Sequence, residues 1–82
     1  MADRNLTVRE LKKLLEAHGC TVEISGKNFF KATRQEGGLV RRWTQHAHKG
    51  IHDRFDRIFV GRARRRLGFA DMSDEEFYKP LG

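Results

Sequence analysis

The spacing of apolar residues changes at Gly19, and this change limits the folds open to the chain. Before it, apolar side chains recur at helical spacing, at Val8, Leu11, Leu14 and Leu15. Thr7 and Glu10 match a capping box, and a glycine suits the left-handed residue that ends a helix. After it, short segments with strand character cover 20–24, 28–33 and 39–44, separated by turn residues at 25–27 and 35–38. The sequence therefore predicts one helix followed by a three-stranded antiparallel meander.

A second helix is expected to start near 51–53 and to stop at Gly68, with Phe55, Ile58 and Phe59 on its apolar face. Further on, Ser73 to Glu76 repeats the capping-box pattern and predicts one short helical turn. The order α-β-β-β-α predicts an α+β domain with both helices on one face of the sheet. A chain of 82 residues has room for a single domain over 1–82, with its core over about 6–69 and a tail over 70–82.

Several single residues carry further expectations. Phe29 and Phe30 are adjacent in a strand, so one of the two must lie on the side away from the helices. Trp43 is compatible with the core or with an exposed platform on which unpaired bases stack. Cys20 is the only cysteine, which excludes an internal disulfide and a cysteine-based zinc site, and we interpret it as a packing residue. His18 lies on the apolar stripe of the first helix near its C-terminal end and is expected to pack or to cap.

The charge of the chain favours an anionic partner. Lys and Arg total 17 against 11 Asp and Glu, giving a net charge of +6 and a pI of about 10.1. Such a balance is typical of proteins that bind nucleic acid or an anionic membrane surface. The apolar stretches are only pairs and triplets, so we expect no membrane span, no signal peptide and a cytoplasmic location. Nothing in the sequence predicts a metal or another cofactor.

Six arginines and no lysine lie between positions 54 and 66. Arginine presents a planar, permanently charged set of donors that matches phosphate geometry. Helical projection places Arg54, Arg57, Arg64 and Arg65 opposite the apolar face, with Arg62 and Arg66 beside it. We therefore expect a nucleic-acid role for Arg57, Arg62, Arg64, Arg65 and Arg66, and an extension of the same positive field by Lys27, Lys31, Arg41, Arg42 and Lys49. A solubility surface or a docking surface for an acidic protein is the alternative.

These segments together resemble the HicA-type toxins of bacterial toxin–antitoxin pairs. The resemblance runs from about Val8 to Phe69. It rests on an opening helix over 9–20, a strand entry at Gly26-Lys27-Asn28, a hairpin at Gly37-Gly38, a loop over 46–50 and the closing Arg66-Leu67-Gly68-Phe69. It implies a fold like that of double-stranded RNA-binding domains, cleavage of mRNA and a cognate antitoxin.

One departure from the family pattern bears on function. The family carries its catalytic histidine just after the glycine that opens the second strand, and this chain has Lys27, Asn28 and Phe29 at the matching positions. Asn28 can hydrogen-bond a phosphate or a 2′-hydroxyl but cannot exchange a proton near neutral pH. The resemblance therefore implies RNA binding that survives and family-type cleavage that is lost.

Three histidines offer a second route to chemistry. His46, His48 and His52 lie within seven residues of one another, in a predicted loop before the second helix. Histidine exchanges protons at physiological pH, so a relocated histidine could serve a ribonuclease, although solvated or phosphate-contacting histidines are the better explanation of the cluster. A metal site is less well supported, because the cluster lacks a carboxylate or cysteine at clear spacing.

Three functions remain open from the sequence. The first is an RNA-binding module that uses the arginines, with RNA favoured over DNA by the frame around them. The second is a ribonuclease with a relocated histidine. The third is a small protein-interaction module, of the kind a phage or plasmid encodes, that docks on an acidic protein or an antitoxin.

Overall fold

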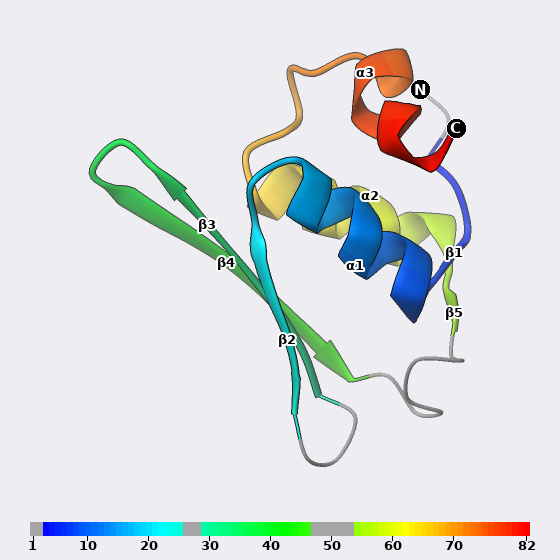
Figure 1. The fold of residues 1–82 in the computed structure, drawn as a ribbon, viewed down its shortest axis with the longest axis horizontal. Helices are drawn as coiled ribbons and strands as arrows, with labels where there is room; N and C mark the ends of the chain where they lie inside the picture. Colours follow the sequence, from blue (N-terminus) through cyan, green and yellow to red (C-terminus); the bar gives the residue numbers. More distant parts are fainter. Residues whose placement is uncertain (1–2, 26–28, 47–53) are drawn as a thin grey trace.

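The computed structural model describes residues 3–25, 29–46 and 54–82, and of His46 it describes the backbone only. The elements follow the predicted α-β-β-β-α order with the predicted short C-terminal helix, which confirms the α+β class, and two short strands are added to it (Figure 1). They are β1 (Leu6–Thr7), α1 (Val8–Ala17), β2 (Thr21–Ser25), β3 (Phe29–Glu36), β4 (Leu39–His46), β5 (Arg54–Phe55), α2 (Arg57–Arg66), α3 (Asp74–Tyr78) and a 3-10 turn (Lys79–Leu81).

Helix α1 has the ends that the sequence predicts. The Thr7 hydroxyl accepts the Glu10 backbone N–H at 3.1 Å, and the Glu10 carboxylate accepts the Thr7 N–H at 2.9 Å, so both halves of the capping box are present. At the other end Gly19 has φ +88°, and the Cys20 N–H donates to the Leu15 carbonyl at 2.9 Å. The apolar stripe of α1 is fully buried, so this helix is fixed against the sheet by its own sequence pattern.

The three long strands form an antiparallel sheet in the order β2-β3-β4. Ala32 in the central strand pairs with Val22 on one side and Trp43 on the other, and all three side chains are buried. Phe30 is buried as well, while Phe29 is 36% exposed, so the expectation that one of the two phenylalanines faces away from the helices is confirmed.

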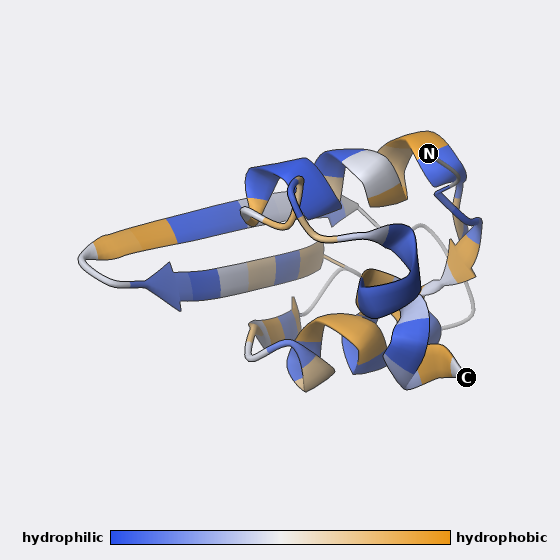
Figure 2. Cartoon of the chain, turned by 90° about the horizontal axis from the view of Figure 1, so that it is seen from above, coloured by the Kyte–Doolittle hydropathy of each residue, from blue (hydrophilic) through white to orange (hydrophobic). Residues whose placement is uncertain are grey.

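The hairpin of β3 and β4 extends well beyond the helices (Figure 1). Its turn contains Gly37 and Gly38, as predicted, and Gly37 has φ +60°. Leu39 and Val40 follow the turn and are exposed, which gives the projecting end of the hairpin its hydrophobic colour in Figure 2.

The second helix begins later than its predicted start near 51–53. Asp56 is its N-cap, and the Asp56 carboxylate accepts the backbone N–H groups of Ile58 and Phe59 at 2.9 and 3.2 Å. Phe55 belongs instead to β5, which pairs with β1 through the register Leu6 to Phe55. The Phe55 ring meets Phe30 and Trp43 edge to face, with centroids 5.4 and 5.6 Å apart, so it is part of the core without being part of the helix.

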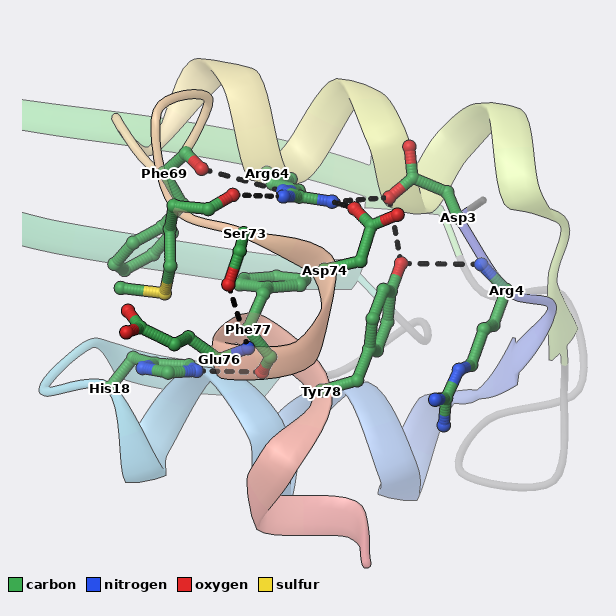
Figure 3. Close-up of polar contacts among 11 residues, drawn as sticks. Asp3, Arg4, His18, Arg64, Phe69, Ser73, Asp74, Glu76, Phe77 and Tyr78 are labelled. Atoms are coloured by element: carbon green, nitrogen blue, oxygen red, sulfur yellow. Dashed lines mark hydrogen bonds and ion pairs between the residues drawn. The ribbon is translucent and has the colours of Figure 1, made fainter. Parts of the chain in front are cut away.

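The C-terminal segment is not a tail outside the core. Phe77 and Tyr78 of α3 are buried, and Figure 3 shows them between α1 and α2. The Phe77 ring stacks on His18 at a centroid distance of 5.3 Å, and the His18 Nε2 donates to the Phe77 carbonyl at 2.7 Å, so the packing role predicted for His18 is confirmed. Ser73 caps α3 by accepting the Glu76 N–H, as the capping pattern predicts. The core therefore continues past Phe69, and the predicted boundary at 69 is wrong.

None of the helices in the described part of the chain is long and apolar enough to span a membrane.

Candidate nucleic-acid interface

The exposed side of α2 is an arginine face. Its buried side is formed by Val60, Ala63 and Leu67, which pack into the core. Because these residues fix the rotation of the helix, four arginines are left exposed to solvent: Arg57, Arg62, Arg65 and Arg66. None of the four forms an ion pair with any residue that the structure describes. We refer to these four arginines as the arginine face.

Ile58 lies on the arginine face and not in the core. Its side chain is 57% exposed, contrary to the prediction that it packs with Phe55 and Phe59. The error has a physical cause, since Phe55 precedes the helix and the true apolar stripe runs through Val60 and Ala63 instead. Residues four apart on a helix are neighbours, so Ile58 lies one turn before Arg62.

Arg64 is a buried structural residue and does not belong to the arginine face, although the sequence analysis included it in the predicted binding set. It is 1% exposed, and its guanidinium donates to Asp74 at 2.6 Å and to Asp3 at 3.1 Å (Figure 3). It also donates to the carbonyls of Phe69 and Met72. These partners come from the N-terminal segment, the α2–α3 connection and the start of α3, so Arg64 links α2 both to the distant N-terminal segment and to the segment that follows the helix.

The surroundings of Arg64 keep it charged. Burial by itself lowers the pKa of a guanidinium, but the hydrogen bonds from Arg64 to Asp74 and Asp3 outweigh that effect and raise its pKa above the ordinary value. Gly61, one turn earlier, makes room for Asp3, because a Cβ on Gly61 would lie 2.7 Å from the Asp3 Oδ2. The glycine within the helix is therefore explained by the approach of Asp3.

A hollow of about 240 Å³ lies between the edge strand β4 and the arginine face. Arg42 borders it from β4, and Arg62 and Arg66 border it from α2. The Arg62 guanidinium lies over the Phe59 ring at 5.8 Å, a cation–π contact that holds the arginine beside the hollow. Its remaining lining consists of Phe59, Trp43, Thr44 and Gln45, and no acidic side chain is among the described residues around it. A second, shallower hollow is lined by Arg62, Arg65 and Arg66.

Arg41 is held by contacts within the fold. It pairs with Arg34 across the β3–β4 hairpin, and its Nε lies 3.6 Å from a Glu36 carboxylate oxygen. A Cβ placed on Gly68 would lie 2.8 Å from the same Nε, so the side chain packs against the end of α2. Arg34 donates to the Leu67 carbonyl at 2.8 Å, so it caps the C-terminal end of α2 beside Arg41. Arg41 therefore contributes to the anchoring of the hairpin, which the sequence reasoning did not predict.

The other predicted residues fall into two groups. Lys31 is half-buried on β3, in register with Glu23 of β2, and does not border the hollow. Lys27, Asn28, Lys49, His48 and His52 lie outside the described residues, and so does the side chain of His46, whose backbone ends β4. Within the described residues no group of three or more His, Cys, Asp or Glu is placed to hold a metal ion.

Two buried side chains agree with their predicted packing role. Trp43 is 7% exposed, so of its two interpretations the core position is confirmed, although the residue also borders the hollow. Cys20 is buried, and burial raises the pKa of its thiol to about 11 even though the nearby Arg34 acts in the opposite direction. A thiol of this kind is a poor nucleophile.

Sequence reasoning missed four residues that the structure brings to this surface: Ile58, Phe59, Thr44 and Gln45. All four lie here because β4 is at the edge of the sheet beside α2, and this arrangement depends on tertiary packing.

Comparisons with protein-family models, curated proteins and solved structures found no match to this chain.

Proposed function

We propose that the protein binds nucleic acid through the arginine face and the adjoining edge of β4, and that RNA is its ligand. The observation that carries the proposal is the convergence of Arg42, Arg62 and Arg66 on one hollow without an acidic neighbour among the described residues. Guanidinium groups form charge-assisted, often bidentate hydrogen bonds with phosphate oxygens. The net charge of +6 adds a long-range field that attracts a polyanion.

The absence of ion-pair partners supports this assignment over a solubility surface. A solvated helix face usually mixes charges of both signs, as α1 does with Lys12 and Glu16, which are 3.4 Å apart. The arginine face has no such partner among the described residues, so four like charges repel one another in the free protein. Phosphates would neutralise them.

The choice of RNA rests on the resemblance to HicA-type toxins and on the α-β-β-β-α frame they share. We propose binding without the cleavage mechanism of that family, because the matching positions hold Lys27, Asn28 and Phe29. A toxin–antitoxin origin and a cytoplasmic location belong to the same proposal.

Salt-dependent titration tests the function. Binding of a fluorescent RNA is measured by anisotropy at several salt concentrations. The logarithm of the affinity should fall linearly with the logarithm of the salt concentration, with a slope of about 0.7 to 0.9 per phosphate contact. Absence of binding at low salt would refute the proposal.

Charge-matched variants locate the surface. Replacing Arg62 and Arg66 together by Gln should lower the magnitude of the slope by about 1.4 to 1.8. The control replaces Arg9 and Lys13 by Gln, which removes the same charge from exposed positions of α1. An equal loss in both double variants would mean that net charge, and not the arginine face, determines binding.

A further inference from the structure

We infer that the hollow between β4 and α2 holds one nucleotide unit of an unpaired strand, with Ile58 in contact with a neighbouring base. This inference rests on the proposed function and narrows its ligand from RNA in general to an RNA strand whose bases are unpaired. It depends on the shape of the hollow, on its polar groups and on the exposed apolar residue beside it.

The size and lining of the hollow suit a single phosphate and its sugar. Its volume of about 240 Å³ is below the ~300 to 1,000 Å³ of pockets for drug-sized ligands. Arg42 borders the hollow from β4 while Arg62 and Arg66 border it from α2, so a phosphate in the hollow would have arginine residues on two sides. Thr44 and Gln45 add a hydroxyl and an amide, which can donate to or accept from a ribose.

Ile58 distinguishes an unpaired strand from a duplex. An apolar side chain that is 57% exposed among arginines gains nothing from phosphates, which are the groups that a duplex presents most prominently. The faces of bases in a duplex are covered by stacking, whereas an unpaired strand can turn a base toward an apolar or aromatic surface. Ile58 lies one helical turn from Arg62, so a base on Ile58 and a phosphate near Arg62 are compatible with one short segment of chain.

The test compares three probes of equal length: an unpaired RNA 12-mer, its duplex, and a peptide of alternating Glu and Leu. The protein variants are Ile58→Ala and, as a control, Leu39→Ala. Leu39 is an exposed apolar residue of the same kind, 59% exposed, at the far end of the hairpin. Trp43 is the only tryptophan and borders the hollow, so its emission reports occupancy.

The unpaired strand should bind at least about tenfold more tightly than the duplex and should change Trp43 emission. Ile58→Ala should weaken binding of the unpaired strand about fivefold and leave binding of the duplex unchanged, while Leu39→Ala should change neither affinity. Equal binding of both RNAs without a change in emission would overturn the inference and leave the proposed function standing. Binding of neither RNA would overturn both, and tighter binding of the peptide would assign the surface to an acidic protein.

Discussion

Replacing Arg64 by Gln is expected to destabilise the protein severely. Breaking a buried ion pair by removing one partner costs about 3 to 5 kcal/mol, because the remaining charges lose their counter-ion. The lower end applies here, since the Asp3 and Asp74 side chains are 15% and 36% exposed and can recover contact with water. We therefore expect a loss of about 3 kcal/mol, from a total stability of about 4 to 12 kcal/mol for a domain of this length.

Thermal and urea unfolding, followed by circular dichroism, measure this loss. A change of about 3 kcal/mol in a domain of this size lowers the melting temperature by about 12 to 24 °C. The control is Arg65→Gln at the next position, which removes the same charge from an exposed site and should change the free energy of unfolding by less than about 0.5 kcal/mol.

A double-mutant cycle with Asp74→Asn attributes the effect to the ion pair. Because Asp74 lies 2.6 Å from the guanidinium, the two substitutions should be less costly together than the sum of their separate effects, by about 0.5 to 3 kcal/mol. Equal melting temperatures for the Arg64 and Arg65 variants would refute the structural role of Arg64 and would indicate that its side chain is exposed like those of the arginine face.

Three further predictions concern single residues. Gly68→Ala should lower the free energy of unfolding more than Gly19→Ala does. Both sites have φ near +90°, which costs a non-glycine residue about 1 kcal/mol, but only at Gly68 would a Cβ also lie within 3 Å of the Arg34 guanidinium. Urea unfolding of the two variants measures the difference. At pH 8, Cys20 should react with a thiol reagent only after denaturation, because burial raises its pKa to about 11, and fast reaction of the folded protein would contradict this. Burial and a hydrogen bond to a carboxylate raise the pKa of Tyr78 from 10.0 to about 12, so its phenolate absorbance should appear near pH 12 in the folded protein. Because the unfolded chain releases this proton first, the contribution of Tyr78 to stability should be complete below pH 10 and be lost between pH 10 and 12, and Tyr78→Phe should abolish this part of the pH dependence.

Local signals in the sequence predict much of the fold. The capping box at Thr7, the N-cap at Ser73, the helix end at Gly19 and the turn at Gly37 depend only on residues a few positions apart, and the structure confirms each of them. The strands also follow from local pattern, although β3 runs three residues further than predicted, to Glu36, and β4 runs two residues further, to His46.

The remaining features depend on partners that are distant in sequence. Helical projection places Arg64 opposite an assumed apolar stripe, but its counter-ions lie at Asp3 and Asp74, and no local pattern indicates them. The same projection assigns Ile58 to the core, because it cannot show that Phe55 leaves the helix to pair with Leu6. The candidate site was therefore predicted as a set of arginines, while its shape and its apolar contact required the packing of β4 against α2.

A titration of isotope-labelled protein with an unpaired RNA, followed by backbone amide NMR, tests the proposed interface most directly. We predict that shifts concentrate in β4 from Arg42 to Gln45 and in α2 from Arg57 to Arg66, and that they disappear when salt is raised. The exposed side of α1 around Lys13 should remain unchanged. Shifts that concentrate on α1 or α3, with α2 and β4 unaffected, would contradict the account.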